Sequence, residues 1–354
     1  MITSELSLTL LETLCAVPGI SGFEGPVAAA LGAYLGQQGV ECQLDRVGNL
    51  LAHVPGSGPR VLLVAHMDEV GFVVRKIERD GFLRLERVGG SAVQALAGEH
   101  VIISADSGPV PGVVGIVPPH LKSEAPGDGL GSMYVDAGFR SKAAALECGV
   151  QVGSPVCYNP RFQKLQNCVS AKALDDRAGC ALLAQLAAEV KIKTGGAACD
   201  LYLGFVVQEE NVLTGGLPLL NAAQPDWVLG VDATLTYDSP DFNHPYSEVA
   251  LGGGPAIKIM DHIRGRGQGL IAHPLLRRHI ETVAKQASLP LQREVAVGIS
   301  TAVAPMPFQP VATPTAAVSF PLRYSHSPAE VADLGDLHQT LQLLHCIVAD
   351  PWQG

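Results

Sequence analysis

One apolar run and the acids that follow it limit what this chain can fold into. Residues 201–207 contain no charged side chain, and Gln208, Glu209 and Glu210 come directly after them. A short apolar run of this kind is typical of a strand buried on both faces of a sheet. In open α/β sheets, ligands bind beyond the carboxyl ends of the strands. Because adjacent side chains of extended backbone point to opposite sides, we expect one glutamate to bind a metal ion and the other to face a substrate.

Strands and helices alternate over most of the 354 residues. Apolar runs predict strands at 60–65, 201–207, 227–231, 256–260 and 315–322. Helical spacing predicts helices at about 5–16, 24–38, 178–190, 217–223, 271–287 and 328–348. This alternation predicts an α/β fold with a doubly wound, mostly parallel sheet.

A segment with a different residue composition interrupts this alternation. Between residues 71 and 163 the chain has short β-like runs, many glycines and prolines, and little helical spacing. We therefore expect a catalytic α/β domain formed by residues 1–70 and 164–354. A small, all-β, barrel-like domain at 71–163 would be inserted into it.

Charge and composition exclude several classes of protein. The net charge is −10 and no Lys/Arg-rich block is present, which argues against binding of nucleic acid or an anionic membrane. No segment reaches 18 uninterrupted apolar residues, so we expect no membrane span. The first six residues lack the features of a signal peptide, and the eight scattered cysteines form no Cys-x-x-Cys pair. We expect reduced thiols and a cytoplasmic protein.

Polar side chains follow four further predicted strands, namely His66, Asp175, Asp232 and His326. Each alone has an ordinary explanation, as a strand-end or loop histidine, a helix cap or a turn residue. Together with Glu210 they supply two imidazoles and three carboxylates. Two zinc-like ions carry four positive charges, which three carboxylates and one bridging hydroxide would balance. Since five ligands would serve two ions, one carboxylate must bridge them, and Asp175 is the natural candidate.

Eight short stretches, in this order and spacing, resemble one known family. They are Gly-Ile-Ser-Gly-Phe-Glu (19–24), Asp-Arg-Val-Gly-Asn-Leu (45–50), Ala-His-Met-Asp-Glu-Val-Gly-Phe (65–72), Gly-Val-Val-Gly (112–115), Ala-Leu-Asp-Asp-Arg (173–177), Val-Gln-Glu-Glu (207–210), Gly-Val-Asp (230–232) and Pro-Leu-Arg-Tyr-Ser-His-Ser-Pro (321–328). The sequence is similar here to the tetrahedral (TET-type) metallo-aminopeptidases, which include glutamyl and deblocking aminopeptidases and chains labelled endoglucanase M.

The resemblance implies a role for each matching residue. One metal ion would be held by His66, Asp175 and Asp232, and the other by Asp175, Glu210 and His326. Glu209 would be the general base and acid, Asp68 would orient His66, and the Asp175-Asp176 peptide bond would be cis. The ions would be divalent, with zinc expected and cobalt or manganese as alternatives. The fold implied is a zinc-peptidase-like domain with a β dimerisation domain.

The implied activity is release of N-terminal residues from short peptides through a metal-bridging hydroxide, in a homo-oligomer that builds from dimers to a dodecamer. Three stretches depart from the family pattern. Val212 stands where a glycine is usual, 297–302 lacks the Asp of a Gly-Thr-Asp-Ala-like segment, and 305–310 is rich in proline. Two alternatives therefore stay open. The protein could be a metal-dependent amidohydrolase or deacylase acting on a non-peptide or N-acylated substrate, or a catalytically reduced assembly protein.

Overall fold

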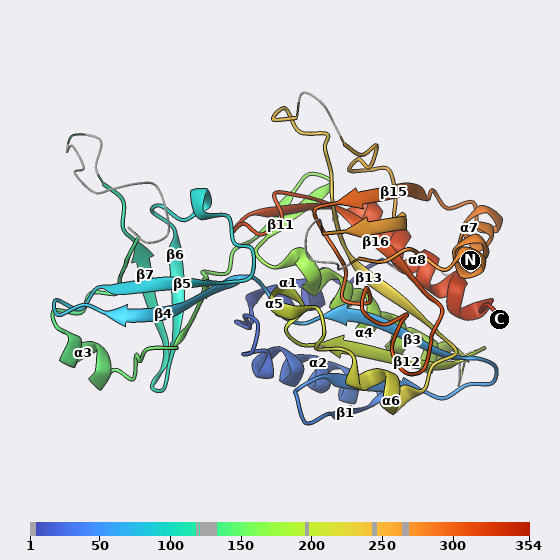
Figure 1. Cartoon of the computed structure of the whole chain (residues 1–354), viewed down its shortest axis with the longest axis horizontal. Coiled ribbons are helices and arrows are strands. Elements are labelled where there is room, and N and C mark those ends of the chain that lie inside the picture. Colours follow the sequence, from blue (N-terminus) through green and yellow to red (C-terminus); the bar gives the residue numbers. More distant parts are fainter. Residues whose placement is uncertain (1–4, 118–119, 121–132, 195–197, 243–245, 264–268) are drawn as a thin grey trace.

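The computed structural model describes the chain except residues 1–4, 118–119, 121–132, 195–197, 243–245 and 264–268. Part of the N-terminal stretch used to argue against a signal peptide therefore lies outside the described residues. Two parts of the chain stand side by side in Figure 1, a small β-barrel and a larger sheet with its helices. The small barrel is formed by a segment in the first half of the sequence.

The larger part is built on an eleven-stranded sheet with the order β1-β2-β12-β3-β13-β16-β17-β11-β10, in which β14 pairs with β16 and β15 with β14. Its strands are β1 (Glu41–Leu44), β2 (Leu50–Val54), β3 (Arg60–His66), β10 (Phe162–Leu165), β11 (Cys168–Ala171), β12 (Asp200–Val206), β13 (Trp227–Leu235), β14 (Ala256–His262), β15 (Gln292–Val297), β16 (Thr315–Arg323) and β17 (Glu330–Asp333). Strands β12, β3, β13 and β16 form a parallel centre, and β14 and β15 are also parallel.

The remaining pairs are antiparallel, so the sheet is mixed and the expectation of a mostly parallel sheet is wrong. Several flanking strands are short and partly exposed, and they give no continuous apolar run that would reveal them in the sequence. One of them, β17, takes the first residues of the predicted helix at 328–348. Alternate residues of β17 are buried, which is the period of a strand.

The helices are α1 (Leu8–Ala16), α2 (Gly25–Gln37), α3 (Lys142–Glu147), α4 (Leu174–Thr194), α5 (Glu209–Val212), α6 (Pro218–Ala223), α7 (Pro274–Gln286) and α8 (Leu334–Ala349). Side chains cap the starts of several of these helices. Ser7 accepts a hydrogen bond from the Leu10 amide, and Asp333 accepts two from the first turn of α8. None of the helices in the described ranges combines the length and apolar character that crossing a membrane requires.

Both faces of the sheet are covered. The larger core packs α1, α2, α4, α7 and α8 against one face. Leu62 and Val64 of β3 point to the other face, where they meet α6 and the segment around Met306. The helix α4 crosses behind β3 and β13 (Figure 1). A parallel centre buried on both faces explains why these strands read as continuous apolar runs.

The barrel closes in the order β4-β5-β8-β7-β6-β9. Its strands are β4 (Gly71–Ile77), β5 (Leu83–Val88), β6 (His100–Ala105), β7 (Gly108–Val114), β8 (Val135–Asp136) and β9 (Pro155–Tyr158). It has its own apolar core, which includes Phe72, Leu85 and Tyr158. β4 begins five residues after His66, so the chain leaves the parallel centre of the sheet at its carboxyl edge and enters the barrel there.

Candidate metal centre

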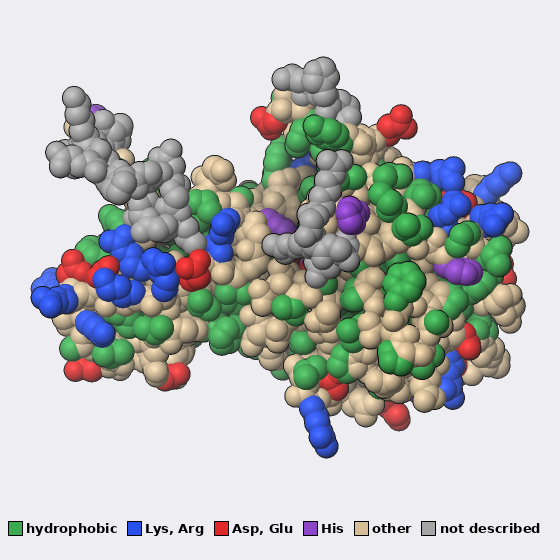
Figure 2. Space-filling view, viewed as in Figure 1, with side chains coloured by type: hydrophobic (Ala, Val, Ile, Leu, Met, Phe, Trp, Pro, Cys, Tyr) green, Lys and Arg blue, Asp and Glu red, His purple; other side chains and the backbone are tan. Residues whose placement is uncertain are grey.

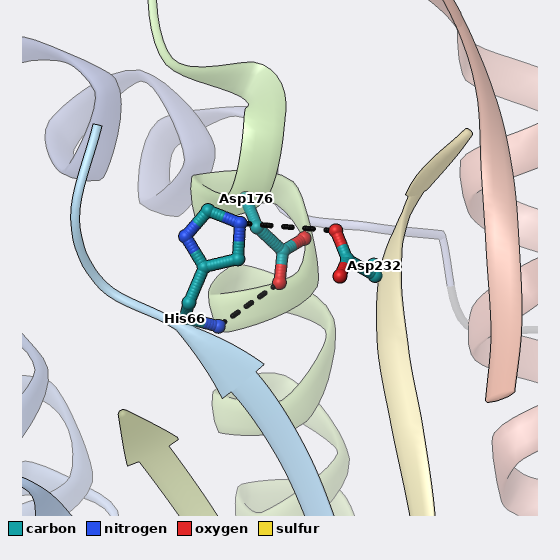
Figure 3. A group of neighbouring side chains, drawn as sticks. All are labelled: His66, Asp176 and Asp232. Carbon is teal, nitrogen blue, oxygen red and sulfur yellow. Dashed lines mark hydrogen bonds and ion pairs between the residues drawn. The ribbon is translucent and has the colours of Figure 1, made fainter. Parts of the chain in front are cut away.

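His66 is the last residue of β3 and is 1% exposed. Its Nδ1 lies 3.1 Å from the backbone carbonyl oxygen of Asp68, and its Nε2 lies 3.2 Å from Oδ1 of Asp175 and 3.7 Å from Oδ1 of Asp232. Figure 3 shows the imidazole beside the carboxylate of Asp232, which extends from the neighbouring strand β13. When Nδ1–H is donated to that carbonyl, the neutral His66 imidazole turns the lone pair of Nε2 towards the two acids.

The prediction that Asp232 ends its strand is wrong, because β13 continues to Leu235. Its parallel pairing with β3 stops at Gly230, opposite Val64. Beyond this point β13 stays paired with β16 but no longer with β3. The side chain of Asp232 therefore reaches the space over His66.

Asp175 lies between two imidazoles. Its Oδ1 faces His66, and its Oδ2 accepts a hydrogen bond of 3.1 Å from the Ser325 hydroxyl and lies 3.6 Å from Nε2 of His326. The peptide bond between Asp175 and Asp176 is cis, which confirms that expectation. One carboxylate thus spans the two histidines, each through a different oxygen.

His326 and Glu210 form the second half of the cluster. Oε1 of Glu210 lies 3.0 Å from Nε2 of His326. His326 has φ +64°, in the left-handed region, and its Nδ1 lies 3.3 Å from the carbonyl oxygen of Gly90, next to the barrel. A Cβ added to Gly90 would stand 2.9 Å from this nitrogen, so the close approach requires glycine.

Glu209 and Glu210 lie in the first turn of α5 and not in extended backbone, so the argument that they point to opposite sides of a strand is wrong. Gln208 has φ +57° and turns the chain from β12 into α5. Both glutamates nevertheless face the cluster: Oε2 of Glu209 lies 3.9 Å from Nε2 of His66, and Glu210 meets His326. The sequence pattern did not reveal that the backbone leaves the extended conformation after Val206.

Asp68 holds this turn in place. Its Oδ1 and Oδ2 accept hydrogen bonds of 3.0 Å each from the amides of Glu209 and Glu210, and Oδ2 also accepts one from the Ser21 hydroxyl. The Asp68 carboxylate is 3.5 Å from Nδ1 of His66, farther than its own backbone carbonyl. Burial acts to raise the pKa of Asp68, but its hydrogen bonds with His66 and the neighbouring groups lower the pKa below its ordinary value. Asp68 therefore positions α5 as well as His66.

Asp176 also borders the cluster but already has partners. Its Oδ2 accepts a hydrogen bond of 3.1 Å from the His66 amide (Figure 3), and its Oδ1 accepts one of 3.1 Å from the amide of Gly179. A Cβ at Gly179 would overlap this carboxylate. Although Asp176, His66 and Asp232 together could hold an ion, these two hydrogen bonds fit Asp176 better as the group that joins the end of β3 to the start of α4.

Glu330 is a site residue that sequence reasoning missed. It is 2% exposed, and its two oxygens accept hydrogen bonds from the amides of His326 (2.7 Å) and Asp175 (3.0 Å). One carboxylate thus fixes the backbone positions of two residues that are 151 positions apart in the chain. The only sequence signal was an acid four residues after His326, and such a spacing is too common to identify a site.

The acids of the cluster repel one another. Burial raises the pKa of Glu209 and Glu210, and it raises the pKa of Asp232 to about 7. Burial acts to lower the pKa of both imidazoles, but nearby carboxylates outweigh it. The charge of Glu209 raises the pKa of His66, and the charge of Glu210 raises the pKa of His326 to about 10. The raised pKa values reflect carboxylates that are buried close to one another and to the two imidazoles. Divalent cations fit this donor set, because imidazole and carboxylate ligate zinc and similar ions.

The cluster opens into a cavity of about 700 Å³. One wall is formed by Ile263 and by 298–300, part of the stretch that departs from the family pattern. Asp261, which is 1% exposed, accepts hydrogen bonds from the hydroxyls of Ser300 (3.2 Å) and Thr301 (3.1 Å). The family pattern has an aspartate within residues 297–302, and this chain has none there. Asp261, on β14, holds the loop from another part of the chain.

The second departure, at Val212, also has a structural account. Val212 is the last residue of α5, and the following Leu213 takes the left-handed conformation with φ +61°. Both residues line the cavity. The substitution therefore adds apolar surface to the cavity without placing a β-branched residue at positive φ.

Comparison with known proteins points to one family. The family described as M42 glutamyl aminopeptidase matches residues 48–343. The putative aminopeptidase SgcX of Escherichia coli is 40% identical over 96% of this chain and 93% of its own length. A TET aminopeptidase from a marine sediment Thaumarchaeota archaeon superposes with a TM-score of 0.90 at 28% identity, over 97% of this chain and 96% of its own.

Another solved structure adds information on assembly. The TET1 peptidase of Pyrococcus horikoshii, which can assemble into a tetrahedron or a large octahedral shell, superposes with a TM-score of 0.86 at 28% identity. The match covers 97% of this chain and 99% of that one. These similarities span both the sheet and the barrel.

Proposed function

Since the chain belongs to the M42 glutamyl aminopeptidase family and is an aminopeptidase, we propose that it uses two divalent metal ions to release N-terminal residues from short peptides. The observation that carries the proposal is the position of Asp175, whose two oxygens face the Nε2 atoms of His66 and His326. A carboxylate in this position is suited to bridge two ions.

In this proposal each ion takes one imidazole, one terminal carboxylate and the shared Asp175. Asp232 completes the set at His66, and Glu210 completes the set at His326. Zinc is the first choice and cobalt or manganese the alternatives, because the same ligands accept several divalent ions. When bound, such ions polarise a peptide carbonyl and lower the pKa of water.

Glu209 is the proton carrier of the proposal. It borders the cavity, and burial raises its pKa, which suits a group that must both accept and release a proton near neutral pH. It would take the proton of the attacking water and deliver it to the departing amine. Asp68 supports this step from behind, because it holds the amide of Glu209 through Oδ1.

Two experiments test the proposal. Glu209→Gln should abolish hydrolysis of an aminoacyl p-nitroanilide while two ions per chain are still bound, as counted by elemental analysis. Full activity in this variant would refute the role of Glu209, and one ion per chain in the wild type would refute the dinuclear site. A panel of free and N-acetylated peptides then separates the aminopeptidase from a deacylase, since only the former requires a free α-amine.

The barrel is the proposed assembly unit. We assign residues 71–163 to a dimerisation domain, and 1–70 with 164–354 to the catalytic domain. We expect dimers to build a dodecamer, because a TET1 peptidase that superposes on both parts of this chain was solved as a dodecamer and can assemble into a tetrahedron or a large octahedral shell. Light scattering of the purified protein measures this directly. The eight unpaired cysteines, four of them buried, favour a cytoplasmic setting.

A further inference from the structure

The barrel contributes one wall of the cavity. Gly89, Gly90, Ala92 and Arg87 line it from the end of β5 and the segment that follows. Leu83 and Leu85 of the same strand point into the barrel core, and Arg87 continues this side of β5 where the strand nears its end. Arg87 is exposed, so its side chain is not packed in the barrel. Figure 2 shows Lys and Arg side chains gathered on the barrel, away from the middle of the face.

The charge environment of Arg87 differs from that of its neighbour Arg75. Among the described residues, no carboxylate lies within 4.0 Å of its guanidinium, whereas Arg75 on the neighbouring strand pairs with Glu86. Of the described residues that line the cavity, Arg87 is also the one Lys or Arg. Four acids line the same cavity, and in the proposed function two divalent ions balance them. The guanidinium then remains as a positive charge without a partner.

Apolar side chains also line the cavity. Leu235, Ile263 and Ile299 line it, together with Ala233 next to Asp232. An apolar side chain fits there, and an anion does not. The cavity thus combines apolar side chains, one arginine from the barrel segment, and the cluster of acids and histidines.

The segment that carries Arg87 is fixed relative to the cluster. His326 Nδ1 lies 3.3 Å from the Gly90 carbonyl oxygen, and the Ala92 amide donates a hydrogen bond of 3.1 Å to the His326 carbonyl. Two residues lie between Arg87 and Gly90, so at most about 11 Å of extended chain joins them. An extended tripeptide has a similar length of about 10 Å.

We propose that Arg87 binds the C-terminal carboxylate of di- and tripeptide substrates, whose apolar N-terminal residue packs against Leu235, Ile263 and Ile299. A guanidinium recognises a carboxylate through two parallel hydrogen bonds, which gives both charge and direction. The inference rests on the proposed function and adds a substrate class to it, namely short peptides with a free carboxyl terminus.

The test compares three substrates of the metal-loaded enzyme: Leu-Gly-Gly, the C-terminal amide of Leu-Gly-Gly, and leucine p-nitroanilide. Arg87→Met should lower kcat/KM for the free acid about tenfold, mainly through KM, because it removes a charge-assisted hydrogen-bond pair. The amide and the anilide should change less than about twofold, since neither offers a carboxylate. Arg87→Lys should recover part of the loss. The matched control, Arg75→Met, removes a paired arginine of the barrel and should leave all three substrates unchanged.

Each other result has a definite meaning. An equal loss on all three substrates, or no loss on any, overturns the role of Arg87 while the aminopeptidase assignment stands, because the wild type still cleaves the anilide. The same holds if Arg75→Met lowers the acid-to-amide ratio as much as Arg87→Met. A wild-type enzyme that is inactive on all three substrates refutes the proposed function, and the inference falls with it.

Discussion

Replacing Asp68 with asparagine tests how the site is held together. The Asp68 carboxylate is fully buried and accepts from two consecutive amides, those of Glu209 and Glu210, one on each oxygen. An asparagine offers one oxygen and one NH₂ group. Whichever way the amide is turned, one of the two backbone N–H groups at the start of α5 faces a donor. The proposed proton carrier, Glu209, or the proposed metal ligand, Glu210, is displaced as a result.

The size of the effect follows from the lost contact. A hydrogen bond to a charged acceptor contributes roughly 1.5–3 kcal/mol. If losing this hydrogen bond raises the activation free energy by the same amount, kcat falls about 10- to 100-fold, since about 1.4 kcal/mol corresponds to a factor of ten. The same range is typical of groups that support metal ligands. We expect the loss in kcat together with weaker metal retention against a chelator, because Glu210 is one of the proposed ligands.

The assay is steady-state hydrolysis of leucine p-nitroanilide, with metal content measured after dialysis against a weak chelator. Ser21→Ala is the matched control. It removes the third donor to Asp68 but leaves both α5 amides bonded. Asp68→Asn activity within about threefold of the wild type would refute the reasoning, because it corresponds to less than 1 kcal/mol. Equal losses in the two variants would refute it as well.

Three further predictions concern the pocket and the core. Asp261→Ala should raise KM more than it lowers kcat, as measured by steady-state kinetics, because it releases the 298–301 loop without touching the cluster. Lys258→Met should lower the unfolding free energy in urea by about 3–5 kcal/mol, since it leaves the buried Glu294 uncompensated. The double variant Lys258→Met/Glu294→Leu should recover most of that loss, and a loss equal to the sum of the single variants would contradict the coupling. Burial raises the pKa of Cys15 and Cys157 to about 12, so both thiols stay protonated below about pH 11, and mass spectrometry should find them unlabelled by iodoacetamide at pH 8 until urea unfolds the chain.

The parallel centre of the fold and the gathering of polar residues at its edge could be predicted from the sequence. Strands buried on both faces leave continuous apolar runs, and β3, β12, β13 and β16 all do so. The polar residues after these runs, including His66 and Glu210, are brought together because parallel strands end at one edge. The cis peptide bond at Asp175 was implied by the family resemblance and is present.

The groups that hold the site were harder to predict, because they act through backbone atoms. Glu330 and Asp176 bond to amides, and Asp261 bonds to hydroxyls of a loop that is distant in sequence. Such contacts depend on where the chain returns in space, and no residue spacing records that. The flanking antiparallel strands were missed for a related reason, since short and partly exposed strands such as β10 have no clear apolar period.

Gly179 has a consequence for anyone who wishes to make this protein more heat-resistant. A glycine inside a helix such as α4 is a standard target, because alanine is about 1 kcal/mol more favourable in helical backbone. Here the methyl group would enter the volume of the Asp176 carboxylate, which in turn bonds to the His66 amide. A propensity-guided substitution at this position would therefore trade catalytic geometry for helix stability, and stabilisation efforts are better directed to helices far from the site, such as α7.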